Sequence, residues 1–217
     1  MILRLFPALF VLAAASMLPQ AAPQPAAPDP PAGAGPLGFR YILPDDWQIV
    51  GASSVSSSEH KKEEKGAPTA EEKKGIDCLQ VVMTARHGDP PTVIVVDALP
   101  FACYGQTLTD TELPGFGSGA AEGLKQAFDI SSPIESSYMI AGHKMWIQRA
   151  RAIPKGQTAP QYTVEIACTL LQKGVVCWLA QASDEAGLRV FEQSSVILDG
   201  VSAPALVPSG AFLQPHR

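Results

Sequence analysis

The sequence predicts an α+β fold in which a twisted, largely antiparallel sheet is covered by two helices. Most apolar residues recur at every second position, the spacing of strands whose side chains point to opposite faces of a sheet. Short turn sequences rich in Gly, Pro and Asp separate these segments, so consecutive strands should pair as antiparallel hairpins. Two segments instead have helical spacing, and we expect them to cover the sheet.

The beginning of the chain has the features of a secretory signal peptide. Arg4 precedes an apolar run from Leu5 to Leu18, and small residues follow that run. The alternative is a membrane anchor, but a spanning helix needs about 20 apolar residues, and this run is shorter and contains Pro7. We therefore predict a signal peptide over 1–22, a secreted or periplasmic location, and no transmembrane segment in the mature chain.

The rest of the chain divides by composition into a linker, one domain and a tail. Residues 23–37 are rich in Pro and Ala and are predicted to form a disordered linker. Residues 38–202 carry the periodic segments and are predicted to form a single α+β domain. Within it, the stretch 53–75 contains five Lys and five Glu, which indicates a mobile charged insertion. The Pro-containing tail, 203–217, is predicted to be flexible.

The overall charge limits the class of partner. The net charge is −5, and 17% of the residues are charged. A nucleic-acid-binding protein carries a basic footprint, whereas this chain is weakly acidic. We therefore expect the partner to be a protein or a small ligand and not a nucleic acid.

Four predicted strands precede the first predicted helix. The stretch 38–52 should form two strands around a turn at Pro44–Asp46. The stretch 76–105 should form two more around Gly88–Pro91. In 113–130 a Gly-rich loop leads into a helix, because apolar residues recur at i, i+3, i+4 and i+7. This apolar stripe comprises Ala120, Ala121, Leu124, Ala127 and Phe128.

Four more strands and a second helix complete the predicted domain. The stretch 133–153 should form two strands joined at Ala141–Gly142, and 160–182 should form a further hairpin. The stretch 183–198 has the pattern of a closing helix, with a capping residue at its start. Its inward-facing residues are expected to be Leu188, Phe191 and Ser195.

The four cysteines are predicted to form two disulfides. Their spacings match neither the closely spaced pairs of zinc sites nor the C-x-x-C motif of thioredoxin-like redox pairs. An even number of cysteines in an exported chain is typical of disulfides. Four cysteines allow three pairings, and we favour Cys78–Cys103 and Cys168–Cys177 because each pair belongs to one predicted hairpin.

The pairing of Cys168 with Cys177 depends on the register of its hairpin. If Leu170 faces Val175 across a turn around Gln172–Gly174, the two cysteines lie directly opposite each other, within reach of a disulfide. A register two residues away, with Lys173–Gly174 as the turn, would place Leu170 opposite Cys177. The cysteines would then be diagonal, so the bridge, if it forms, also selects the register.

Two short segments resemble a known family. The segment 39–47 has the arrangement aromatic-x-aromatic-x-x-Pro-x-x-Trp. The residues that carry it are Phe39, Tyr41, Pro44 and Trp47. In this it resembles the start of PsbP-like domains, although Asp46 stands where that family often has Gly. The stretch FEQSSVIL, 191–198, is similar to the family's closing helix. The resemblance implies an α/β/α sandwich used mostly for binding or assembly, and it implies no functional residue here.

The sequence predicts no catalytic residue, cofactor or metal site. GFGSG, 115–119, lacks the third Gly of a dinucleotide-binding loop and the Lys of a P-loop. Ser118 does not stand in the G-x-S-x-G pattern of a nucleophile elbow. A triad of a serine, His87 and either Asp97 or Asp89 can be written down, but the spacing does not favour it.

Arg149, Arg151 and His143 are the candidate contacts for an anion or a partner. Arg149 and Arg151 share one face of a predicted strand, where two guanidinium groups can hold an anionic group. His143 begins the same strand. The alternative is a strand that runs from a buried middle to an exposed end, where the arginines are solvated.

The function predicted from these observations is a secreted, disulfide-stabilised, non-catalytic domain for binding or assembly. The alternative is an extracytoplasmic hydrolase with a dispersed active site. A deep pocket that combines a His or a carboxylate pair with a nucleophile would favour the hydrolase. A flat or shallow surface would favour the binding domain.

Overall fold

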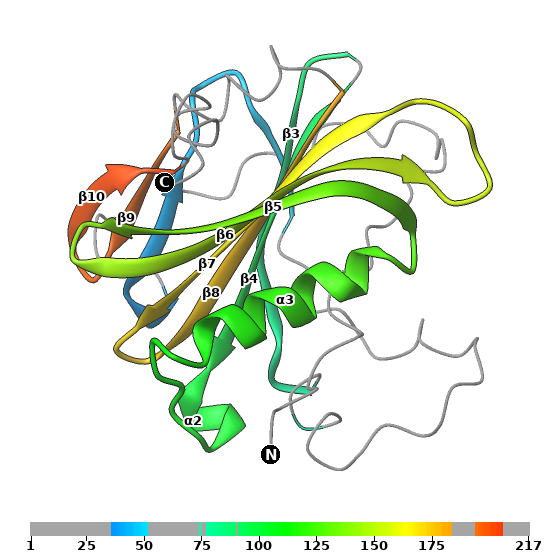
Figure 1. The fold of residues 1–217 in the computed structure, drawn as a ribbon. Helices are drawn as coiled ribbons and strands as arrows, with labels where there is room; N and C mark the ends of the chain where they lie inside the picture. The colour runs from blue at the N-terminus through cyan, green and yellow to red at the C-terminus, as the bar shows by residue number, and fades with distance from the viewer. Residues whose placement is uncertain (1–35, 52–73, 75–76, 90, 184–193, 206–217) are drawn as a thin grey trace.

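The computed structural model of the chain describes residues 36–51, 74, 77–89, 91–183 and 194–205 (Figure 1). The predicted signal peptide, and nearly all of the linker and of the charged insertion, lie outside these residues. The same holds for 206–217 of the predicted tail and for 184–193 of the predicted closing helix.

Within the described residues the chain forms ten strands, two α-helices and one short 3-10 helix. In chain order they are η1 (Pro36–Gly38), β1 (Phe39–Ile42), β2 (Gln48–Gly51), β3 (Gln80–His87), β4 (Thr92–Pro100), α2 (Phe101–Tyr104), α3 (Leu113–Leu124), β5 (Phe128–Ile140), β6 (His143–Pro154), β7 (Tyr162–Leu171), β8 (Gly174–Ala182), β9 (Ser195–Leu198) and β10 (Val201–Pro204). Strands are therefore the main element of this part of the chain.

The described strands form two antiparallel sheets. The larger sheet has the order β2-β3-β4-β8-β7-β6-β5, and the smaller sheet has the order β1-β9-β10. β1 and β2 follow each other in the sequence but belong to different sheets, so the turn at Pro44–Asp46 carries the chain from one sheet to the other. Figure 1 shows that the larger sheet is strongly twisted, as expected for strands with a right-handed twist.

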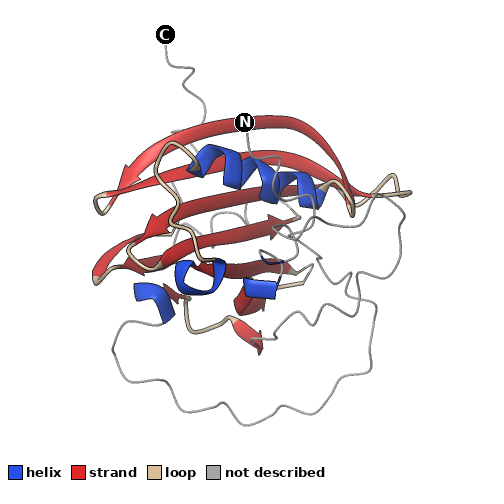
Figure 2. Ribbon diagram, turned by 90° about the horizontal axis from the view of Figure 1, so that it is seen from below, coloured by secondary structure: helices blue, strands red, loops and turns tan. Residues whose placement is uncertain are grey.

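Strands β4, β7 and β8 of the larger sheet are buried on both faces over most of their length, because α3 covers one face and the smaller sheet covers the other. Trp178 of β8 packs under the smaller sheet, where its ring stacks on Phe39 at a centroid distance of 5.8 Å. On the opposite face Trp146 of β6 belongs to the core that α3 completes. Figures 1 and 2 show α3 lying against one face of the larger sheet. Every residue of β8 is buried, which is why its sequence is apolar at nearly every position.

The prediction of an α+β fold with two covering helices is wrong, and so is the α/β/α sandwich that the resemblance implied. The second cover is the three-stranded sheet and not a helix. Ser195–Leu198, expected to end the closing helix, forms β9 and pairs with both β1 and β10. Val196 and Leu198 are buried, whereas Ser195 and Ile197 between them are half-buried. This period of two is that of a strand, which distant pairing partners stabilise.

The first predicted helix is present but shifted. α3 includes the GFGSG stretch, which was expected to be a loop, and it ends before Phe128, which instead opens β5. Pro114 stands in the first turn, where a missing N–H costs no helical hydrogen bond. The Glu112 carboxylate accepts hydrogen bonds from the N–H and the hydroxyl of Thr109 just before the helix. The glycines lower the intrinsic helix propensity, so tertiary packing must stabilise this helix.

Gly117 shows what the glycines contribute to that packing. A Cβ built at Gly117 would lie 2.1 Å from the indole ring of Trp146, far inside van der Waals contact. Side chains of α3 on both sides of this position are buried against the sheet. They are Leu113, Phe116, Ala120 and Leu124. Gly117 therefore allows the helix to rest directly on Trp146, a close approach that a larger residue would prevent.

The hairpins predicted at 76–105, 133–153 and 160–182 are confirmed by the strand registers. Between β5 and β6, Ala141 and Gly142 have φ values of 50° and 82°, which is typical of a two-residue type I′ turn. In the β7–β8 hairpin Leu170 faces Val175. The alternative register, with Leu170 opposite Cys177, is not formed.

Gly117→Ala is expected to reduce the free energy of unfolding by about 1–3 kcal/mol, because the added methyl group must displace Trp146 or the helix. Gly115→Ala is the matched control, since the Cβ position of Gly115 is open and the residue lies on the same helix. That control should be neutral or stabilise the protein by up to about 1 kcal/mol. Urea unfolding measures both, and equal effects would contradict the close packing described.

Candidate functional site

Two disulfides anchor the elements around the centre of the larger sheet. Cys78–Cys103 joins the segment before β3 to α2 with a Cα–Cα distance of 5.6 Å. Cys168–Cys177 joins opposite positions of β7 and β8 with a Cα–Cα distance of 4.1 Å. The observed pairing is the one favoured from the sequence. The second disulfide lies on the face of the sheet that α3 covers, so it belongs to the core and contributes no accessible thiol.

Arg149 lies in an ion pair inside the fold. Its Nε and Nη2 atoms lie 2.6 and 2.5 Å from Oε2 of Glu165, which stands opposite Arg149 on β7. The Glu165 side chain is completely buried, and the Arg149 side chain is 15% exposed. The guanidinium therefore compensates a carboxylate that has lost its water, a situation in which the partner is indispensable.

The other two candidate contacts lie at different ends of β6. Arg151 is exposed, and its Nη1 donates a hydrogen bond of 3.0 Å to the side chain of Gln161. His143 begins β6, where its Nδ1 lies 2.9 Å from the carbonyl oxygen of Leu170 and its Nε2 lies 3.7 Å from Asp199. The structure thus places Arg149 and Arg151 on one sheet face, as expected, and places His143 apart from them, where it links neighbouring turns.

His87 contacts Asp46 and neither of the aspartates considered in the sequence. Nε2 of His87 lies 2.6 Å from Oδ2 of Asp46, and the imidazole packs against Trp47 at a centroid distance of 5.5 Å. This contact joins the end of β3 to the turn before β2. Asp97 lies in β4 opposite Cys177 of β8, so the combination of His87 with Asp97 is not formed.

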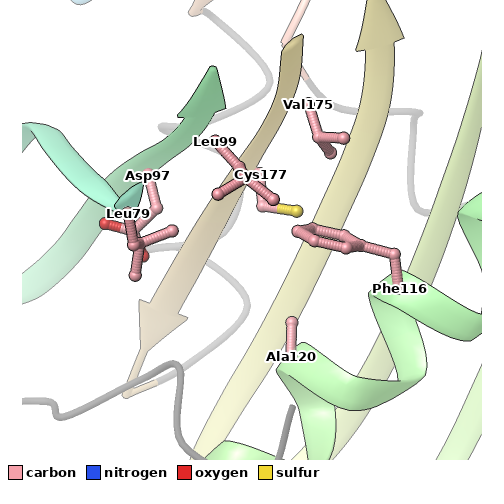
Figure 3. Close-up of a pocket in the computed structure, with 7 residues that line it drawn as sticks. All are labelled: Leu79, Asp97, Leu99, Phe116, Ala120, Val175 and Cys177. Carbon is pink, nitrogen blue, oxygen red and sulfur yellow. The ribbon is translucent and has the colours of Figure 1, made fainter. Parts of the chain in front are cut away.

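Asp97 instead borders a small hollow between α3 and the larger sheet (Figure 3). The lining residues are Leu79, Asp97, Leu99, Phe116, Ala120, Val175 and Cys177. Figure 3 shows Asp97 beside Leu79 at one side, Phe116 at the other, and Cys177 between them. The hollow has about 210 Å³ of empty space when its open mouth is included. Its inner part is so narrow that it holds about one water molecule.

The carboxyl group of Asp97 is buried without compensation. The residue is 4% exposed, and Oδ1 has no hydrogen-bond partner in the structure. Burial disfavours the ionised form and raises the pKa of Asp97 from 3.8 to about 7. Asp97 therefore changes its charge near neutral pH beside a hollow whose accessible walls are apolar.

Sequence reasoning missed this feature, although a signal was present. Asp97 is the one ionisable residue in the strand TVIVVDALP, which is otherwise apolar apart from its first Thr. An acidic residue in a strand that is expected to be buried requires a partner or a function. The sequence does not reveal which neighbours surround it, because they come from the segment before β3, from α3 and from β8.

The described residues contain no group of three or more His, Cys, Asp or Glu side chains that could hold a metal ion. In the same part of the chain, no helix has both the length and the apolar character needed to cross a membrane. α3, the longer of the two α-helices described, has 12 residues.

Comparison with known proteins does not show a family. No family model matches the chain, and no curated protein matches it. Among solved structures, the chain is similar to LpqN, described as involved in cell envelope biogenesis of Mycobacterium tuberculosis. The identity is 18% and the TM-score 0.38, over 73% of this chain and 83% of that chain. The PsbP-like resemblance is not confirmed.

Arg149→Ala is expected to destabilise the protein by about 3–5 kcal/mol, because it leaves Glu165 charged and buried. Arg151→Ala is the matched control on the same strand face, and its exposed side chain should contribute less than about 1 kcal/mol. Adding Glu165→Gln to Arg149→Ala should recover part of the loss, because no charge is then buried. Chemical denaturation measures all three variants. Equal losses in the two arginine variants would contradict the role given to the ion pair.

Asp97→Asn is expected to change the dependence of stability on pH. The folded state binds the Asp97 proton more tightly than the unfolded chain, so stability should fall as the pH rises from about 4 to about 7. The variant should lose this fall and be more stable than the wild type at pH 8, by up to about 4 kcal/mol. Asp129→Asn, at an exposed position, is the control. Parallel stability profiles for the wild type and Asp97→Asn would contradict the uncompensated burial.

Proposed function

We propose that this protein is an exported, disulfide-stabilised domain that binds a small ligand at the hollow beside Asp97. One observation carries the proposal: Asp97, whose buried Oδ1 has no hydrogen-bond partner, is among the residues that line a hollow that opens to solvent. Nearly all buried polar groups in proteins have partners. An unsatisfied group at the wall of a hollow therefore supports a site that is completed by something from outside the chain.

The location that fits this role is secreted or periplasmic. All four cysteines are in disulfides, which form and persist in oxidising compartments. The predicted signal peptide over 1–22 supports the same location. The disulfides bracket the hollow, since Cys177 lines it and Cys78 immediately precedes Leu79 of its wall. An oxidising compartment would therefore preserve both disulfides and, with them, the positions of the residues that line the hollow.

Two features favour binding over hydrolysis. His87 is held by Asp46 and Arg149 is held by Glu165, so these groups connect elements of the fold to one another. The hollow, in turn, is too narrow for the reacting part of an ester or a peptide, because its inner part holds about one water molecule. A site of this size is suited to capturing a small terminal group of a ligand.

The proposed function is tested by saturation-transfer NMR of the purified protein with a mixture of small amines, carboxylates, alcohols and sugars. At least one of these classes should bind the wild type. Ala120→Leu, which adds a side chain from α3 into the hollow, should abolish that binding. Gly115→Leu adds the same side chain to the same helix at an open position and should leave binding intact.

The result is interpreted only for variants whose thermal unfolding remains cooperative, and Asp97→Asn serves as a second variant if Ala120→Leu fails to fold. Binding of none of the four classes, or equal binding by the wild type and the filled variant, would contradict the proposal. Labelling by a fluorophosphonate that His87→Ala removes would support the hydrolase in its place.

A further inference from the structure

The edge strand β5 is much longer than the other strands at the borders of the two sheets. β1, β2 and β10 have four residues each, whereas β5 has 13. Within the part of the chain that the structure describes, β5 pairs with β6 alone, and no strand lies along its other side (Figure 1). The backbone groups on that side can therefore pair with a further strand.

The features of β5 that oppose such pairing are confined to its first half. Ser132 has a φ of 51°, Pro133 has no N–H to donate, and the register with β6 shifts around these two residues. Over Ile134–Ile140 the register is regular, and the stretch contains no Pro, Lys or Arg. Glu135 is its one charged residue. Because bulges, proline and charge are the usual protection of an edge strand, these seven residues form a largely unprotected edge.

The exposed apolar side chains of this stretch lie on opposite faces of the sheet. Ile134 is 48% exposed and Met139 is 68% exposed. Ile134 shares a face with Tyr138, which packs against the core under the smaller sheet. Met139 lies on the other face, which holds Trp146. A partner that docks on one face covers one of these side chains, whereas a strand added to the edge covers both.

We propose that β5 pairs antiparallel with β5 of a second copy of this chain, so that the two seven-stranded sheets become one continuous sheet. In a two-fold dimer one residue faces its own copy, and residues equally far before and after it face each other. An axis at Ser137 is the one that uses all seven residues of the regular stretch. In this register Ile134 lies opposite Ile140 of the second copy, which covers its exposed side chain.

The charges of the stretch support a second copy as the partner. With the axis at Ser137, Glu135 lies opposite Met139 of the second copy, and the two copies of Glu135 are about 13 Å apart along the strands. Like charges are therefore not opposed. Lys144 stands beside Met139 on β6 and is the one basic residue on that face of the β5–β6 hairpin. The carboxylate of each copy thus approaches the ammonium group of the other, two strands away.

The experiment is analytical ultracentrifugation of the full chain, with both disulfides formed, over a range of concentrations. We expect a monomer–dimer equilibrium. Ser137→Glu places like charges directly opposite each other at the axis and should weaken the dimer about tenfold or more. Ser131→Glu, the same change at an exposed position of β5 outside the regular stretch, should leave the dimer intact. A monomer at all concentrations up to about 1 mM, or equal effects of the two variants, would overturn the proposal.

The register is tested by cross-linking. Positions 135 and 139 face each other only between copies, so a mixture of Glu135→Cys and Met139→Cys should form disulfide-linked dimers on mild oxidation. Either variant alone should not, because its introduced thiols are then about 13 Å apart along the strands. Equal cross-linking by the mixture and by the single variants, or none by the mixture, would contradict this pairing. None of the residues that line the hollow belongs to β5, so the proposed ligand site survives that outcome.

Discussion

The register of β8 between β4 and β7 is the constraint on which the other features depend. Side chains alternate between the faces of a sheet, so a shift of one residue would exchange every β8 side chain between the two cores. In the observed register Cys177 and Leu179 belong to the core under α3, while Trp178 belongs to the core under the smaller sheet. The Cys168–Cys177 disulfide joins directly opposite positions and is therefore compatible with this register and not with its neighbours.

Two carboxyl groups are buried because both faces of the larger sheet are covered around them, and they differ in how their loss of hydration is compensated. Glu165 of β7 is fully buried, and Arg149 of the neighbouring strand compensates it at 2.5–2.6 Å. Asp97 of β4 is almost as deeply buried on the helix-covered face, but Oδ1 has no partner. At both positions an ionised carboxylate loses its hydration, and this desolvation is unfavourable. It is offset within the fold at Glu165, whereas at Asp97 it is left for protonation or for a ligand to offset.

The parts of the fold that could be predicted are those that depend on neighbours in the sequence. Alternation and turn residues, which a short stretch of chain displays, predicted the β7–β8 hairpin and favoured the observed disulfides among three possible pairings. The three-stranded sheet that covers the second face of the larger sheet could not be predicted in the same way. Ser195–Leu198 is too short to distinguish a strand from a helix by period, and its partner β1 comes from the beginning of the domain. The start of α3 could not be predicted for a similar reason. The glycines at its beginning indicate a loop, and the need for Gly117 in a helix is evident only from the ring of Trp146 packed against it.

By itself, the sequence determined the alternation of the strands and the positions of the main hairpins, because these depend on backbone geometry over a few residues. It favoured the two disulfide pairs among three possible pairings, and the structure contains that pairing. It also placed Arg149 and Arg151 on one strand face, but it did not show that Arg149 is paired with Glu165. Only the tertiary structure decided that the second cover is a sheet and that Asp97 borders a hollow. The reason is physical: the partner and the pKa of a buried group are set by the side chains packed against it, and around Asp97 these come from segments far apart in the chain.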